Sequence, residues 1–108
     1  MSNNNYQRGA AFERRVMDLY EEAGYTVIRS AGSHSKADVI AIKAIYVAGV
    51  QQTDVLFTQC KYGSKISKKE REALFAMDLG PQVEMVVAWS EPRKPIMLYN
   101  KYGEFTLD

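Results

Sequence analysis

The sequence has few of the residues that build cross-linked or membrane-spanning folds. It contains one cysteine, Cys60, and one histidine, His34, and a single cysteine excludes both an internal disulfide framework and a zinc site made of cysteines. No apolar run reaches the roughly 18 residues needed to span a bilayer. The first residues are polar, without the apolar region of a signal peptide. We therefore expect a soluble, cytoplasmic protein with no membrane contact, and disorder over residues 1–5.

Proline is also sparse, with three residues in the chain, and no internal repeat or low-complexity segment is present. The 108 residues, 46% of them hydrophobic, suffice for one small domain, which we take to be residues 1–108. A formal net charge of +1 lacks the overall basic excess typical of DNA-binding domains. The basic residues are nevertheless unevenly distributed, because they gather between residues 61 and 71, with a second group at Arg8, Arg14 and Arg15.

Hydrophobic spacing predicts an α/β domain in the order helix, three strands, helix, two or three strands. Phe12, Val16 and Tyr20 fall on one helical stripe, which predicts an amphipathic helix over residues 7–23 with Gly24 just past its end. Runs rich in β-branched and aromatic residues predict strands at 25–29, 39–47, 55–60, 83–89 and 96–99, with a short one near Phe105.

Two local patterns refine this outline. Residues 37–61 are predicted to form one antiparallel hairpin with a longer connection at 48–53. Ser67 followed by Glu70 has the spacing of a capping box, which predicts a second helix running to about Leu79, stopped by the Gly-Pro pair that follows.

One set of polar residues has the spacing of a hydrolytic site. Period-two geometry places Gln59 and Lys61 on the same face of their strand, and Asp38 lies beside them if the hairpin forms. Oxygen ligands next to a lysine suit phosphodiester hydrolysis, since a Mg²⁺ ion neutralises phosphoryl charge while the lysine orients water. Glu13, at the edge of the apolar stripe of the first helix, can complete the site.

Four motifs together carry a resemblance to a known family: Arg8-Gly9-x3-Glu13-Arg14, Arg29-Ser30-Ala31-Gly32-Ser33, Ala37-Asp38 and Gln59-Cys60-Lys61. In this order they resemble the archaeal-type Holliday junction resolvases, which some viruses and phages also encode, within the PD-(D/E)xK nuclease superfamily. The resemblance covers residues 6–90. It implies a restriction-endonuclease-like fold, with a mixed central sheet flanked by helices.

The resemblance also implies an activity and the roles of individual residues. It implies a homodimer that binds a four-way DNA junction and resolves it by paired symmetrical nicks, with Mg²⁺ as the cofactor and Mn²⁺ as a substitute. Glu13, Asp38 and Gln59 would hold the metal, Lys61 would act on the water or the developing charge, and Ser30 would contact the backbone near the cut. The residues expected to contact DNA are Arg8, Arg14, Arg29, Ser33, Lys65, Lys68 and Lys69.

One position departs from the family pattern, because Gln59 stands where the family usually has glutamate. Its carbonyl oxygen can coordinate a metal but brings no negative charge, so metal affinity should fall. Two alternatives therefore stay open beside the junction resolvase. One is a nuclease of the same fold that cuts flaps, nicked DNA or linear duplex, and the other is a DNA-binding module without catalysis.

Several further residues have competing interpretations. His34 is either a solvated loop residue or a base near Asp38, and Cys60 is expected to pack in the core. The cations at the start of the second helix oppose its dipole, which favours phosphate contact. Phe75 and Leu79 are expected in the core or, by resemblance, in a dimer interface, and most of the seven tyrosines are expected to be ordinary strand residues.

Overall fold

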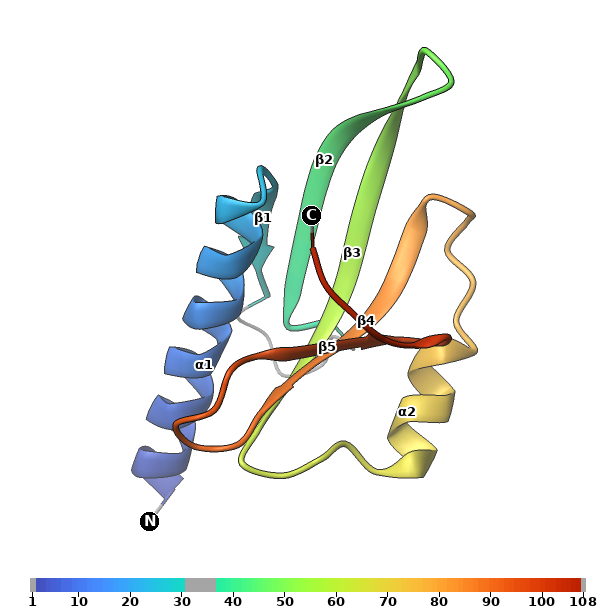
Figure 1. Ribbon diagram of the computed structural model, residues 1–108. Helices are drawn as coiled ribbons and strands as arrows, with labels where there is room; N and C mark the ends of the chain where they lie inside the picture. Colours follow the sequence, from blue (N-terminus) through green and yellow to red (C-terminus); the bar gives the residue numbers. More distant parts are fainter. Residues whose placement is uncertain (1, 31–36, 108) are drawn as a thin grey trace.

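The computed structural model describes residues 2–30 and 37–107, with side chains from residue 8 onward. Two helices flank one six-stranded sheet whose strands lie side by side in chain order (Figure 1). β3 and β4 run parallel and all other neighbouring pairs run antiparallel, so the predicted mixed α/β sheet is confirmed. The elements are α1 (Ser2–Glu22), β1 (Thr26–Arg29), β2 (Val39–Val47), β3 (Val50–Tyr62), α2 (Lys68–Phe75), β4 (Val83–Ser90), β5 (Met97–Asn100) and β6 (Gly103–Phe105).

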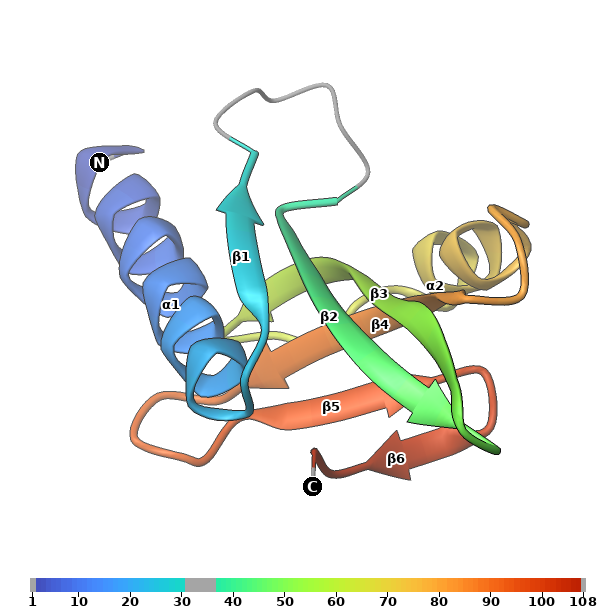
Figure 2. The same ribbon diagram turned by 90° about the horizontal axis from the view of Figure 1, so that it is seen from above.

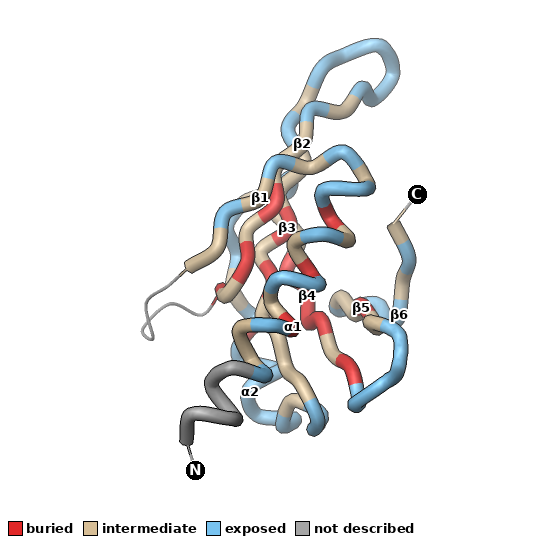
Figure 3. The backbone as a smooth tube through the Cα atoms, turned by 90° about the vertical axis from the view of Figure 1, so that its left-hand side faces the viewer, coloured by how far each residue is buried: buried red, intermediate tan, exposed pale blue. Residues whose placement is uncertain are grey.

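The two helices lie on opposite faces of the sheet (Figure 2). Phe12, Val16 and Tyr20 of α1 are buried against one face, which confirms the predicted stripe. Leu74 of α2 packs in a second cluster on the other face. Side chains of β4 alternate between the two clusters, as the two-residue period requires, and its run of buried residues is visible in Figure 3.

α1 is longer than the spacing predicts, because it begins at Ser2 instead of residue 7. Residues 2–6 contain neither proline nor glycine, so nothing in that segment breaks the helix. Its other end is as predicted: Gly24 has φ +94°, its N–H donates to the Glu21 carbonyl at 3.0 Å, and the N–H of Tyr25 donates to the Tyr20 carbonyl at 3.0 Å. These two bonds form a Schellman motif, which requires the left-handed conformation that glycine adopts easily.

The β2–β3 hairpin is confirmed, but its predicted longer connection is wrong. Val47 pairs directly with Val50, so the turn contains only Ala48 and Gly49, with φ +52° and +81°. Positive φ at both central positions is typical of a type I′ turn, whose twist matches that of the strands. The hairpin end projects from the sheet in Figure 1, with 72% of Tyr46 exposed.

α2 ends at Phe75 with Ala76 as its cap, so the prediction of a helix to about Leu79 is wrong. The Asp78 side chain accepts from the N–H of Gly80 at 3.0 Å, and this local turn competes with further helix. The predicted capping box is confirmed, since the N–H of Glu70 donates to the Ser67 hydroxyl oxygen at 3.1 Å and that hydroxyl donates to the Glu70 carboxylate at 3.0 Å. Neither helix, over its described residues, is long and apolar enough to cross a membrane.

Candidate active site

Asp38 is held in place by hydrogen bonds to two strands. Its N–H donates to the Thr58 carbonyl at 2.8 Å, and its own carbonyl accepts from the N–H of Ser30 at 2.9 Å. Its carboxylate Oδ2 accepts from the N–H of Cys60 at 2.8 Å. Continuing the β2–β3 register by one residue sets Asp38 opposite Gln59, so the hairpin brings these two predicted residues together.

The environment of Asp38 disfavours a charged carboxylate. Burial raises the pKa of Asp38 above its usual value, and the neighbouring Glu13 carboxylate raises it further. The N–H of Cys60 and the charges of Lys61 and Arg29 oppose this rise without cancelling it. The two carboxylates are therefore close enough to repel each other, and a bound cation or proton at this place would be stabilised.

Glu13 is held by Arg29, which comes from the end of β1. The Arg29 Nε donates to Glu13 Oε1 at 2.8 Å, and the two side chains are only 29% and 19% exposed, respectively. A charge-assisted bond in such a half-buried setting fixes the carboxylate. The structure thus gives Arg29, predicted as a DNA contact, a role in orienting a site carboxylate.

Gln59 and Lys61 lie on the face of β3 that α2 covers. Cys60, between them, packs against the α1 cluster, where burial raises the pKa of its thiol well above the usual range. The predicted alternation is therefore confirmed, and Cys60 is a packing residue, as expected. The Lys61 Nζ lies 3.1 Å from Glu70 Oε2 on the first turn of α2.

Glu70 is the residue of this neighbourhood that sequence reasoning did not assign to the site. It was predicted only as half of the capping box, and its pKa is lowered, chiefly by the hydrogen bond from Lys61. The sequence does contain the two partners of this ion pair, because a lysine and a glutamate flank the short segment between β3 and α2. The direction in which that loop returns toward the strand was not readable from the sequence.

The oxygen ligands expected here are of the type that a hard divalent cation prefers, but only two of the three carry a negative charge. Within residues 2–30 and 37–107, no three histidine, cysteine, aspartate or glutamate side chains lie close enough to hold a metal ion. The ligands expected from the sequence are two carboxylates, Glu13 and Asp38, and the carbonyl oxygen of Gln59, all of them ligand types that Mg²⁺ accepts. The raised pKa of Asp38 indicates a position where added positive charge is favourable.

The residues predicted to contact DNA are spread over three elements. Arg8 and Arg14 are exposed on α1, and Arg14 points about 100° around the helix from Glu13. Lys68 is exposed on the first turn of α2 and lies 3.9 Å from Glu72. Lys65 and Lys69, in the loop before α2 and on its first turn, are exposed. Ser33 and His34 lie outside the described residues.

The pair predicted for the core or a dimer interface is split by the early end of α2. Phe75 ends the helix and packs partly against the second cluster, while Leu79 lies beyond the helix with 49% of its surface exposed. Leu79 is thus not a core residue and remains available to a partner.

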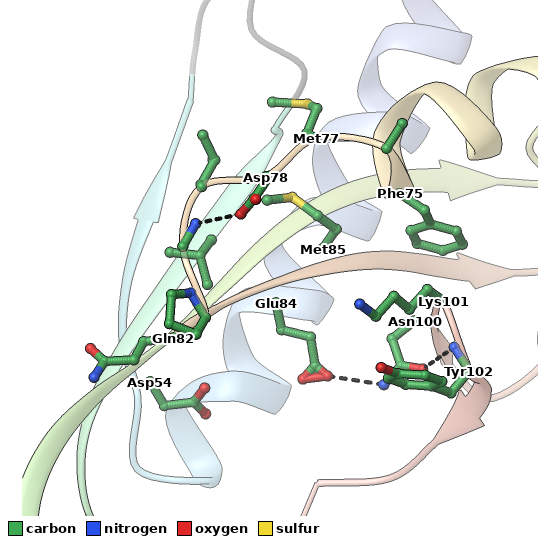
Figure 4. A pocket seen from close by; sticks show the side chains of 15 residues that line it. Asp54, Phe75, Met77, Asp78, Gln82, Glu84, Met85, Asn100, Lys101 and Tyr102 are labelled. Atoms are coloured by element: carbon green, nitrogen blue, oxygen red, sulfur yellow. Dashed lines mark hydrogen bonds between the residues drawn. The ribbon is translucent and has the colours of Figure 1, made fainter.

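A cavity of about 530 Å³ lies away from this site, beside the first residues of β4 (Figure 4). Three acids line it: Asp54, Asp78 and Glu84. Glu84 accepts from the Asn100 side chain at 2.9 Å, as the dashed line in Figure 4 shows. Since phosphate is repelled by carboxylates, this cavity is unsuited to nucleic acid.

Comparison with known proteins identifies the family. The model of the archaeal Holliday junction resolvase (Hjc) family matches residues 4–99. The chain belongs to this family. It is 35% identical over 75 residues to the crossover junction endodeoxyribonuclease Hjc of Methanocaldococcus jannaschii, a match that covers 66% of this chain and 50% of that protein. The chain thus spans about half the length of this curated relative.

A solved structure shares the fold. The 1.6 Å structure of Archaeoglobus fulgidus Hjc, described as a Holliday junction resolvase from an archaeal hyperthermophile, matches with a TM-score of 0.60 and 25% sequence identity. The match covers 86% of this chain and 72% of that one. The resemblance inferred from the four motifs is therefore confirmed at the level of family and fold.

Proposed function

We propose that this chain is a metal-dependent endonuclease that resolves four-way DNA junctions by paired symmetrical nicks, acting on DNA in the cytoplasm. The observation that carries the proposal is the setting of Asp38, a half-buried carboxylate held by the N–H of Cys60 and electrostatically coupled to Glu13, Lys61 and Arg29. Membership of the archaeal resolvase family supports the substrate, as does the similarity to the crossover junction endodeoxyribonuclease Hjc of Methanocaldococcus jannaschii.

The cofactor in this proposal is Mg²⁺, with Mn²⁺ as a substitute. Glu13 and Asp38 would hold it through carboxylate oxygens and Gln59 through its carbonyl oxygen. When bound, the ion supplies charge stabilisation for the phosphoryl oxygens and lowers the pKa of water. Because only two of the three ligands are charged, we expect weaker binding than at a site with three carboxylates.

The chain's own residues divide the remaining work. Arg29 fixes Glu13 through the 2.8 Å bond, and the backbone of Cys60 fixes one oxygen of Asp38. Lys61 places an ammonium group beside the scissile phosphate, where it stabilises charge developing in the transition state or orients the attacking water. Ser30, joined to the Asp38 carbonyl through its backbone N–H, would present its hydroxyl to the DNA backbone.

Paired cutting requires two active sites, so the proposal includes a homodimer. A two-fold assembly matches a junction with two-fold symmetry, and each protomer then cuts one strand. The exposed Leu79, beyond the end of α2, supports placing the contact there.

The deciding experiment is cleavage of a labelled four-way junction by the purified chain, with Mg²⁺ or with chelator. A linear duplex of the same sequence, a flap and a nicked duplex serve as competing substrates, and Asp38→Ala serves as the inactive control. We expect two symmetrical nicks on the junction only, lost with chelator and in the variant. Equal cutting of linear duplex or of flaps would replace this proposal with a different substrate for the same site.

Metal binding is measured separately, by isothermal titration of Mg²⁺ and Mn²⁺ into wild type and Asp38→Ala. Saturable binding in wild type alone supports the ligand set. Junction binding without metal binding or cutting would make the chain a binding module in which Gln59 has removed the activity.

A further inference from the structure

A second cavity, of about 420 Å³, lies on the α2 face of the sheet. Its volume falls within the roughly 300–1,000 Å³ typical of small-ligand sites. The floor is aromatic and apolar, and includes Phe75, Trp89 and Tyr99. This cavity is separate from the acidic one in Figure 4, although Phe75, Asn100 and Lys101 contribute to both.

The charged residues that line this cavity are all cations: Lys65, Arg71 and Lys101. They come from three separate segments, namely the loop before α2, α2 itself and the turn after β5. The acidic cavity, by contrast, has three carboxylates and one cation in its lining. Three cations in the lining, without a carboxylate, suit an anionic ligand, and a phosphate group in particular.

The aromatic floor suits a planar ring. The Nζ of Lys65 lies over the Trp89 ring, 5.4 Å from its centroid, so one face of the ring is open to a side chain from the rim. A nucleobase offers a flat face that can stack on such a ring.

The cavity also adjoins the candidate active site. Trp89 pairs with Lys61 across the parallel β3–β4 ladder, and the two side chains share the α2 face. Lys65 follows Lys61 by four residues, in the loop that leaves the end of β3. A DNA strand with one phosphate at Lys61 would therefore pass the cavity mouth.

We propose that this cavity binds one unpaired nucleotide of a DNA strand, with its base stacked on Trp89 and its phosphate held by Lys65, Arg71 and Lys101. The inference rests on the proposed function for the identity of the strand as DNA. It adds a site that holds a splayed nucleotide next to the cut, where a branch point supplies unpaired bases. On binding, Lys65 moves from the ring face to the phosphate.

Trp89 is the only tryptophan in the chain, so its fluorescence reports directly on the cavity. The test titrates wild type with a deoxythymidine oligomer of roughly eight nucleotides, in chelator so that no cleavage occurs. We expect saturable quenching. Lys101→Gln and Arg71→Gln should each weaken binding about fivefold and lower the salt slope by about 0.7, the value for a lost phosphate contact on a single strand. Arg93→Gln, which removes an exposed cation from the β4–β5 turn outside the lining, is the matched control and should bind as wild type does.

A second variant addresses the stacking. Trp89→Leu removes the ring, and its binding is followed by anisotropy of a labelled oligomer after circular dichroism has verified the fold. We expect about a tenfold loss of affinity. If Trp89→Leu does not fold, the two cation variants decide the question alone, because both replaced side chains are exposed.

Three results would overturn the inference: no quenching in wild type, equal weakening by Arg93→Gln and Lys101→Gln, or a fluorescence change that depends on protein concentration without DNA. The last would assign the cavity to a second copy of the chain. The titration is independent of cutting. Junction cleavage without quenching would refute only this site, and quenching without cleavage would refute only the nuclease.

Discussion

The Nζ of Lys61 and the Oε2 of Glu70 lie 3.1 Å apart, so the first turn of α2 holds the ammonium group of the proposed active site. Both side chains are partly exposed, at 31% and 47%, and an ion pair of this kind contributes little to stability. Its effect is on where the ammonium points. Glu70 also closes the capping box with Ser67, so one carboxylate serves both the helix start and the position of Lys61.

Replacing Glu70 by Gln should separate these two roles. Glutamine still serves a capping box but cannot neutralise Lys61, so we expect about a tenfold lower kcat for junction cleavage from the misplaced ammonium, with an unchanged unfolding midpoint. Ser67→Ala should do the opposite and cost about 1 kcal/mol of stability with little loss of rate. Single-turnover cleavage and urea unfolding measure the two effects. A faster Glu70→Gln enzyme would mean that the pair holds Lys61 away from the phosphate.

Restoring the family's usual residue at position 59 should strengthen metal binding. Gln59→Glu adds a third carboxylate opposite Asp38, so we expect roughly tenfold tighter Mg²⁺ binding and a matching fall in the Mg²⁺ concentration needed for cleavage. Isothermal titration and Mg²⁺-dependent rates check this. Gln51→Glu, at the exposed end of the hairpin, controls for added charge and should change neither. Equal Mg²⁺ affinity in wild type and Gln59→Glu would show that residue 59 is not a ligand.

Much of this arrangement was predictable from the sequence because it depends on periodicity. The stripe of α1, the Schellman glycine, the hairpin and the shared face of Gln59 and Lys61 all follow from periods of 3.6 and 2. The errors occur where local competition decides. The Asp78 side chain accepts from the N–H of Gly80 in a segment that was predicted as helix, and Ala48 accepts a positive φ that allows a two-residue turn.

Contacts between elements were not predictable in the same way. The Arg29–Glu13 bond joins β1 to α1, and the Lys61–Glu70 pair joins β3 to α2. Each contact depends on how two elements pack against each other. The spacing of hydrophobic residues predicts the elements but not which of their polar side chains come into contact. The family motifs marked Arg29 and Glu13 as functional residues. They predicted that Arg29 contacts DNA and did not predict its bond to Glu13.

Asp38→Asn should stabilise the metal-free protein at neutral pH. The pKa of Asp38 is raised by burial and by Glu13, so the folded state binds a proton more readily than the unfolded state. The contribution of Asp38 to stability is therefore greatest below the ordinary aspartate pKa of about 4 and is lost as the pH rises through the raised folded value. Asparagine keeps an acceptor for the N–H of Cys60 and removes this loss. Measured in chelator, the unfolding free energies of wild type and Asp38→Asn should be equal near pH 3, and the variant should be the more stable protein at pH 7. In Mg²⁺, the same variant should have lost cleavage. Asp18→Asn, exposed on α1, should show no such divergence.

The buried hydroxyl pair between α1 and β3 should be strongly coupled. Tyr20 and Thr58 are both fully buried and their oxygens lie 2.6 Å apart. Tyr20→Phe leaves the Thr58 hydroxyl unpaired, which costs about 1–3 kcal/mol. The double variant Tyr20→Phe, Thr58→Val should lose less than the sum of the two single variants, because no unpaired group remains. Urea unfolding of all four proteins measures the coupling, and additive losses would contradict it.

The proposed dimer contact can be tested at its most exposed apolar residue. Leu79 and Val47 are each 49% exposed, but Leu79 follows α2 while Val47 lies at the far end of the hairpin. Burying a charge in an interface core is costly, so Leu79→Glu should raise the dimer dissociation constant about 100-fold, and Val47→Glu should leave it unchanged. Sedimentation velocity over a range of concentrations gives the constant for each protein. Loss of paired nicking in Leu79→Glu, with single nicks retained, would tie dimerisation to symmetrical cutting. A change with Val47→Glu alone would move the contact to the hairpin end.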